Sequence, residues 1–144
     1  MKQNLQKTLA LIKPDLYRQT LLLPTVYQKL KDNNFTVLES QIIKWNYHQA
    51  SQFYKEHEGK FFFERLTGYM TNGPFLALVL ERENAIKGWR ELIGPTQPDR
   101  ARLQSPQTLR AHFGLTDTRN SFHGSDSDEN FLKEYQLVFG KKHH

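Results

Sequence analysis

The chain has 144 residues, of which 38% are hydrophobic and ten are phenylalanines, and it carries a formal net charge of +5. This length fits a single domain, residues 1–144, and is too short for two domains of ordinary size. The absence of cysteine excludes disulfide frameworks and thiolate metal sites, while the positive charge favours a polyanionic partner such as a nucleotide, a nucleic acid or an acidic membrane surface.

The start of the chain gives no indication of secretion or membrane insertion. Residues Met1 to Asn4 do not resemble a signal peptide, and no apolar run nears the roughly 18 residues that a membrane helix needs. We therefore expect a soluble protein without a membrane segment, located in the cytoplasm, with an organellar location left open. His143 and His144 resemble the end of an affinity tag, so they do not enter the search for metal ligands.

The first predicted element is a buried strand, because Thr8 to Ile12 form a short apolar run. Pro14 biases the residue before it away from helical geometry, so the strand should end at Lys13. A lysine at a strand end most often lies at the surface. The alternative is that Lys13 is held at the rim of the sheet, where its ammonium group can neutralise a phosphate.

The next elements follow from hydrophobic periodicity. Apolar residues at helical spacing predict a helix from Leu23 to Leu30, and β-branched and apolar residues predict a long strand from Phe35 to Trp45. Two short helices, Tyr47 to His57 and Phe61 to Tyr69, are expected on either side of Gly59. Their many aromatic side chains are expected mainly to pack in the core.

The middle of the chain predicts a strand, a helix and a loop. Phe75 to Leu80 form a second buried apolar run, and Asn84 is expected to cap a helix that ends at Ile93. Residues Thr96 to Leu103 read as an irregular basic loop, which could contact nucleic acid but more often would simply be solvated. Ser105 and Pro106 should then begin a short helix that reaches about Arg110.

The C-terminal part predicts a loop, a short strand and a last helix. Residues Gly114 to Arg119 form the loop, and Asn120 to His123 the strand. Ser127 or Ser125 should cap the last helix, Asp128 to Phe139, whose apolar residues are spaced to pack on a sheet.

The order of these elements predicts the fold class. Without its inserted helices, the chain contains a β-α-β-β-α-β pattern, which gives a ferredoxin-like fold of the α/β (α+β) class. We therefore expect a four-stranded antiparallel sheet with helices packed on it.

The stretch from Asn120 to Ser127 suggests a catalytic site that handles phosphate. His123 carries a ring nitrogen that is neutral and nucleophilic near neutral pH, and Gly124 would let a ligand approach the backbone. The hydroxyl, carboxylate and amide groups of Ser125 to Ser127 suit a helix cap and a phosphate. Alone, however, a single histidine is more often structural, and such a run is more often an ordinary turn.

The usual phosphate-binding loops are missing. The sequence has neither a Gly-x-x-x-x-Gly-Lys-Ser/Thr loop nor a Gly-x-Gly-x-x-Gly stretch after a strand, so any grip on phosphate must come from side chains. The side chains suited to phosphate or ribose oxygens are Lys13, Arg90, Thr96, Arg110 and Asn120. Individually, each is as readily an exposed charge or a cap.

Two segments together resemble one protein family. Asn120 to Ser127 resembles the active-site signature of the nucleoside diphosphate kinases, and Thr8 to Asp15 resembles their opening strand. The resemblance extends from about Thr8 to Phe139, and Gly114 to Arg119 is most similar to the divergent group typified by the human member numbered six. It implies a ping-pong reaction in which His123 takes the γ-phosphate of a nucleoside triphosphate and passes it to a nucleoside diphosphate.

The resemblance also implies a set of site residues. The nucleotide-binding positions carried over are Lys13, Tyr54, Phe62, Leu66, Arg90, Thr96, Arg110, Asn120 and Glu134. Tyr54, Phe62 and Leu66 would line the nucleotide cleft, where an aromatic plate accepts purines and pyrimidines alike. Glu134 would sit beside His123, and Mg²⁺ would arrive with the nucleotide, so no protein metal ligand is expected.

The chain departs from the family pattern in features that bear on how subunits assemble. Arg90 and Arg110 lie 20 positions apart, more than is usual there, and the extra length falls within Gln97 to Ser105. In typical members this loop meets its symmetry mates in a hexamer, whereas Arg100 and Arg102 would repel their copies. Few residues follow the last predicted helix. We expect a homo-oligomer, either a dimer or a salt-sensitive hexamer, with a mobile loop and reduced activity.

Two other functions remain open at this level. The protein could keep the fold as a binding or regulatory protein without transfer activity, because function resides in sites and does not follow from a fold. It could also bind nucleic acid, a less favoured alternative that rests on its basic charge and its aromatic residues.

Overall fold

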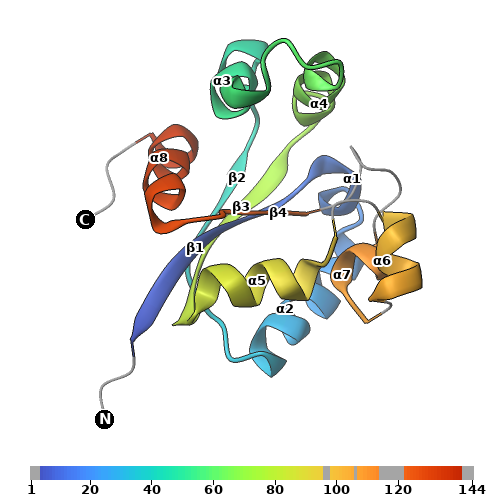
Figure 1. The fold of residues 1–144 in the computed structure, drawn as a ribbon, viewed down its shortest axis with the longest axis vertical. Coiled ribbons are helices and arrows are strands. Elements are labelled where there is room, and N and C mark those ends of the chain that lie inside the picture. The colour runs from blue at the N-terminus through green and yellow to red at the C-terminus, as the bar shows by residue number, and fades with distance from the viewer. Residues whose placement is uncertain (1–3, 96–97, 106, 114–121, 141–144) are drawn as a thin grey trace.

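The computed structural model describes residues 4–95, 98–105, 107–113 and 122–140. Within these residues a single sheet contains the strands β1 (Leu5–Ile12), β2 (Thr36–Ile43), β3 (Phe75–Glu83) and β4 (Phe122–Gly124). The strand order is β2-β3-β1-β4, and every neighbouring pair is antiparallel. The predicted ferredoxin-like, four-stranded antiparallel sheet with helices packed on it is thus confirmed (Figure 1).

The helices connect and cover these strands. They are α1 (Pro14–Tyr17), the 3-10 turn η1 (Thr20–Leu22), α2 (Leu23–Asp32), α3 (Tyr47–Phe53), the 3-10 turn η2 (Lys55–His57), α4 (Phe63–Met70), α5 (Ala85–Ile93), α6 (Pro98–Gln104), α7 (Leu109–Phe113) and α8 (Asp128–Phe139). In the part of the chain that the structure describes, no helix combines the length and the apolar character needed to cross a membrane.

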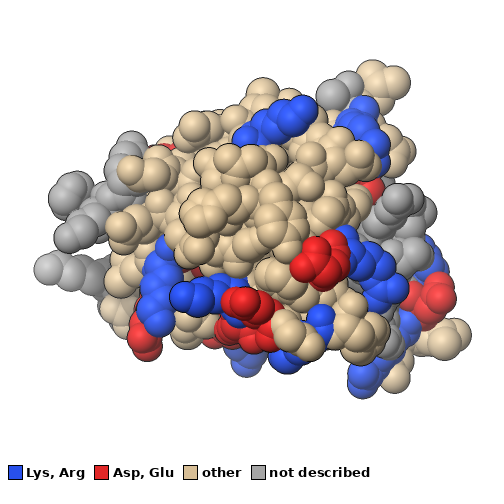
Figure 2. Space-filling model, turned by 90° about the horizontal axis from the view of Figure 1, so that it is seen from above, with Lys and Arg blue, Asp and Glu red and all other residues tan. Residues whose placement is uncertain are grey.

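Both faces of the sheet are covered, which explains the apolar run from Leu9 to Ile12 in β1. Leu9 and Leu11 pack with α3, α4 and α8, whereas Ala10 and Ile12 on the opposite face pack with α1, α2, α5 and α7 (Figure 1). Because successive strand residues point to opposite faces, a strand buried on both sides must be apolar at every position. Figure 2, seen from the side of α3 and α4, shows mostly uncharged residues over its centre, with charged residues gathered toward its margin.

The segment read as an irregular loop is largely helical, so that prediction is wrong. Residues Pro98 to Gln104 form α6. Within it Arg102 bonds Asp99 at 2.8 Å, and Arg100 donates to Gln104 at 2.9 Å. Both pairs lie at helical spacing, so the charges that suggested a solvated loop instead support a helix.

The starts of two other helices also differ from the sequence prediction. The helix expected to start at Ser105 begins at Leu109, because Thr108 first closes a turn by donating its backbone N–H and its hydroxyl to the carbonyl of Ser105. Arg110 therefore lies in the first turn of α7. Asn84 precedes α5 in a left-handed conformation, φ 53°, and its side chain makes no cap.

Candidate active site

His123 lies on the short strand β4, which pairs with the central strand β1. Leu11 is its partner in register, and Ala10 pairs with Gly124. Immediately after the strand, the N–H of Ser125 donates to the carbonyl of Leu9 at 3.3 Å. The candidate nucleophile is thus attached to an inner strand of the sheet.

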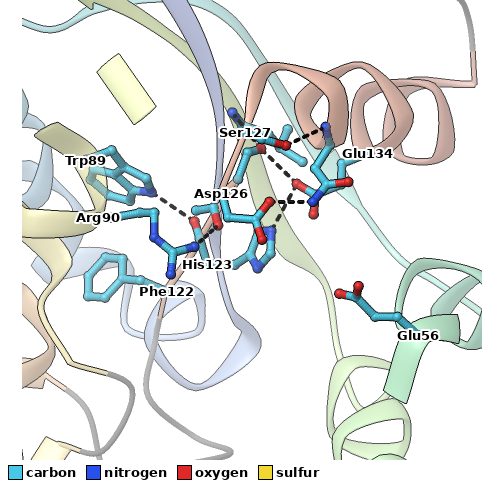
Figure 3. A network of polar contacts seen from close by, with 12 residues as sticks. Glu56, Trp89, Arg90, Phe122, His123, Asp126, Ser127 and Glu134 are labelled. Atoms are coloured by element: carbon cyan, nitrogen blue, oxygen red, sulfur yellow. Dashed lines mark hydrogen bonds and ion pairs between the residues drawn. The ribbon is translucent and has the colours of Figure 1, made fainter. Parts of the chain in front are cut away.

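Three side chains donate hydrogen bonds to the backbone of β4. Arg110 donates to the carbonyl of Phe122 at 2.9 Å. Trp89 donates to the carbonyl of His123 at 2.9 Å, and Arg90 to that of Gly124 at 3.4 Å (Figure 3). On an edge strand, the carbonyls that point away from the sheet are normally left to water. Here side chains from α5 and α7 hold the backbone on both sides of the histidine.

Gly124 allows Trp89 and Arg90 to pack closely against β4. A Cβ atom at this position would lie 2.6 Å from Cδ1 of Trp89 and 3.4 Å from Cγ of Arg90. The space that the sequence suggested for an approaching ligand is therefore filled by the chain itself. A glycine is required here because the indole lies against the backbone.

The imidazole of His123 is oriented by a carboxylate. Its Nε2 lies 3.2 Å from Oε1 of Glu134, and the same oxygen accepts a 2.7 Å hydrogen bond from the hydroxyl of Ser125 (Figure 3). The ring of Phe53 contacts the imidazole edge-on, with centroids 5.1 Å apart. With Nε2 directed at Glu134, Nδ1 is the ring nitrogen available to a substrate.

A cavity of about 550 Å³ is lined by His123 and by most of the other candidate residues. The candidates on its wall are Lys13, Phe62, Leu66, Arg90, Arg110, His123 and Glu134. Tyr54 is absent from this wall: its side chain is buried and stacks behind it on His57, with centroids 6.5 Å apart. Thr96 and Asn120 lie outside the described residues.

Other residues of the wall were not singled out from the sequence. They include Glu56, His57, Arg65, Asp126 and Asn130. Asp126 stands inside the signature, and Arg65 directly precedes Leu66, so proximity to candidates was a usable signal for both. His57 gave none, because only the fold brings its ring between those of Tyr54 and Phe62.

The cationic part of the wall is buried. Lys13 is 5% exposed, and burial together with the charge of Arg110 lowers the pKa of its ammonium to about 7, while Asp15 acts in the opposite direction. Burial and the nearby Arg90 lower the pKa of Arg110 to about 10. Positive charges that disfavour one another in this way would be stabilised by an anion.

Arg110 is also held in place before any ligand binds. Its two terminal nitrogens donate to the carbonyls of Gly94, at 2.6 Å, and Phe122, at 2.9 Å. Its buried Nε has no hydrogen-bond partner among the described residues. A buried donor without a partner is costly, so this geometry favours an added acceptor such as a phosphate oxygen.

The chain is similar to known proteins along most of its length. A family model described as Nucleoside diphosphate kinase matches residues 6–144. The chain is 47% identical to Nucleoside diphosphate kinase 6 of Danio rerio, over 94% of this chain and 77% of that protein, and 44% identical to Nucleoside diphosphate kinase 6 of Homo sapiens, over 95% and 74%. Its structure matches the solved nucleoside diphosphate kinase of Aquifex aeolicus with a TM-score of 0.86 and 34% identity, covering 92% of this chain and 94% of that one.

Proposed function

Because the chain belongs to the nucleoside diphosphate kinase family, and is therefore a phosphotransferase enzyme, we propose that it transfers phosphate through a phosphohistidine at His123. The observation that carries this proposal is the orientation of the imidazole. Glu134 holds Nε2 at 3.2 Å, and the ring borders a cavity lined by Lys13, Arg90 and Arg110. A nucleophile and the cations for its substrate thus share one site.

The first half-reaction begins with a neutral imidazole. Nε2–H donates to the carboxylate of Glu134, so Nδ1 attacks the γ-phosphorus of a nucleoside triphosphate. The Nδ1–P bond forms as the bond from phosphorus to the β,γ-bridging oxygen breaks, and the nucleoside diphosphate leaves with that electron pair. The imidazolium that results is stabilised by Glu134, whose oxygen also accepts from Ser125.

The second half-reaction reverses these bonds with a different acceptor. An oxygen of the terminal phosphate of another nucleoside diphosphate attacks phosphorus, and Nδ1 departs with its electron pair. Lys13, Arg90 and Arg110 stabilise charge on the phosphoryl oxygens in both directions. Because Arg110 is already fixed by two carbonyls, little rearrangement is needed as charge develops.

The remaining substrate contacts come from the α4 side of the cavity. Phe62 provides an aromatic surface for the base, and Leu66 packs beside it. Tyr54 supports this side from behind, through His57, and is assigned no direct contact. Thr96 and Asn120 remain proposed ligands of phosphate and ribose.

Mg²⁺ is proposed to enter as part of the nucleotide complex. The described residues contain no group of three or more His, Cys, Asp or Glu side chains arranged to bind a metal. An ion that arrives with the nucleotide would be coordinated mainly by phosphate oxygens and water. Glu56 and Asp126 on the cavity wall are available to accept hydrogen bonds from its waters.

Intact mass tests the proposal directly. After incubation with ATP and Mg²⁺ and a quench in base, the protein should gain one phosphoryl group and lose it on addition of GDP, CDP or UDP. His123→Ala should do neither, whereas His48→Ala, which changes an exposed histidine of α3, should match the wild type. Transfer by His123→Ala at the wild-type rate would show that another group is the nucleophile. Nucleotide binding without a phosphoryl gain would instead favour a regulatory protein.

We also propose that the chain forms a homo-oligomer, a dimer or a salt-sensitive hexamer. The charge of Arg102 is partly offset by Asp99, so the repulsion expected from α6 falls mainly on Arg100. Salt should therefore affect assembly less than two unpaired arginines would suggest. Light scattering after size exclusion at low and high salt tests this, because a hexamer that survives dilution at both salt concentrations contradicts it.

A further inference from the structure

A second region of the cavity wall, apart from the cations assigned to phosphate, comes from η2, α4 and the residues between them. Here Arg65 lies beside Phe62 and Leu66 on the wall. It is absent from the group of residues assigned above to phosphate. A cation on the side of the cavity assigned to the base raises the question of what it contacts.

The guanidinium of Arg65 is positioned by an aromatic ring. Its Cζ lies 6.0 Å from the ring centroid of Phe61, one turn earlier, and Phe61 is itself 90% exposed and packs edge-on against Phe62. A cation–π contact of this kind limits where the guanidinium can lie while leaving its N–H groups available as donors. In the described part of the chain, Arg65 makes no hydrogen bond or ion pair, in contrast to Arg110.

A base that stacks on the face of Phe62 leaves the polar atoms at its edges available to neighbouring side chains. The flat fork of an arginine matches two adjacent acceptors, and guanine presents such a pair, O6 and N7, on the edge opposite its sugar. Adenine presents N7 beside an amino donor, which opposes the fork. We propose that Arg65 binds the O6/N7 edge of guanine and so makes the site favour guanine nucleotides among the several that it accepts. This inference rests on the proposed nucleotide site.

Lys60 provides a matched control. Its Nζ lies 5.7 Å from the ring centroid of Phe62 and 3.4 Å from Nδ1 of His57, so it is a second cation beside the cavity, although it does not line the wall. An ammonium group is a point charge without a fork. It should attract every nucleotide to the same extent, because all of them carry the same phosphates.

The test is isothermal titration with GDP, ADP, IDP and 7-deaza-GDP, each with Mg²⁺, on wild type and the Arg65→Ala, Arg65→Lys and Lys60→Ala variants. Arg65→Ala and Arg65→Lys should each weaken GDP binding by about 5- to 10-fold, and ADP binding by less than about 2-fold. IDP, which retains O6 and N7, should behave as GDP. 7-Deaza-GDP should bind the wild type more weakly than GDP and respond less to the Arg65 variants. Lys60→Ala should weaken all four equally.

Two results would overturn the proposal. One is an equal loss of GDP and ADP affinity in Arg65→Ala, which would assign Arg65 to the phosphates. The other is wild-type discrimination in Arg65→Lys, which would show that the fork is not used. The titration requires no phosphoryl transfer, so this proposal and the proposed function can fail independently. A protein that discriminates between bases but never forms phosphohistidine would contradict the proposed function and leave the role of Arg65 intact.

Discussion

The two sides of the cavity are built in different ways. On the β4 side, Arg110 and Trp89 are buried and donate to backbone carbonyls, and Nε of Arg110 has no hydrogen-bond partner among the described residues. On the α4 side, Phe61, Phe62 and Arg65 contact one another mainly through ring faces and edges. Hydrogen bonds to a fixed backbone define positions closely, whereas ring contacts tolerate small shifts. The first arrangement suits in-line phosphoryl transfer, and the second suits the binding of different bases.

The Arg110→Ala substitution should have the largest effect on activity and tests the β4 side of the cavity. If the β4 side is a prearranged set of charges, kcat/KM should fall about 100- to 1,000-fold, as when one preorganised donor to a transition state is removed. Steady-state kinetics with ATP and GDP measures it, and circular dichroism checks the fold. Arg102→Ala is the control. Like Arg110, Arg102 donates to a backbone carbonyl, that of Ala111 in α7, but it does not line the cavity. Equal losses in the two variants would show that Arg110 is only structural.

Phe62→Ala tests the α4 side. Removing the stacking surface should weaken nucleotide binding by about 1–3 kcal/mol and leave the rate at saturation much less affected. Titration with ADP, GDP and CDP measures the affinities. Tyr27→Ala removes a partly exposed aromatic from α2, outside the cavity, and should change none of them. An unaltered nucleotide affinity in Phe62→Ala would remove this residue from the site.

Trp89→Phe asks whether the hydrogen bonds of the β4 side matter beyond packing. The ring would still fill the space beside Gly124, but the His123 carbonyl would lose its donor, at a cost of about 1–3 kcal/mol in the free energy of unfolding. We expect the phosphorylation rate of His123 to fall about tenfold, because a loosened backbone misplaces the imidazole. Rapid-quench kinetics measures it. Trp45→Phe, in the core on the opposite face of the sheet from Trp89, should lower stability without a matching loss of rate.

The mildest test changes only the pH. The pKa of Lys13 in the free protein is lowered to about 7, so the ammonium loses its proton as the pH rises above that value, and phosphate must then bind with proton uptake. The Kd for ADP should rise about 3- to 10-fold between pH 7 and pH 9. Lys13→Gln should bind more weakly at pH 7 and show a flatter profile, while Lys87→Gln, at an exposed position, should follow the wild type. A steep profile retained in Lys13→Gln would assign the titration to another group.

The same pKa has a consequence for stability. A lysine with a pKa near 10.5 when unfolded and about 7 when folded binds its proton more tightly in the unfolded state. Its contribution to the free energy of unfolding therefore rises with pH between those two values, and the full cost of burying the charge is present below about pH 7. Lys13→Gln should accordingly unfold at a higher temperature than wild type near pH 6.

Local signals in the sequence were sufficient for most of the strands and helices and for the family resemblance. The last helix has the predicted bounds, Asp128–Phe139, and Ser127 caps it by accepting from the N–H of Asn130 at 3.1 Å. Caps and periodicity involve neighbours in the chain, so they can be read without a structure. The same holds for the buried strand that begins the fold and for the signature around His123, whose family resemblance the comparisons confirm.

The arrangement around His123 depended on contacts between distant residues. Trp89 donates to a carbonyl 34 positions later in the chain, and that contact, rather than a ligand, accounts for Gly124. Tyr54 aligned with a cleft residue yet lies behind the wall, while Arg65 lies on it. Sequence patterns establish which side chains are available and which face of an element is apolar. Only tertiary packing decides which of those side chains reach the cavity and which hydrogen-bond donors are already used by the backbone.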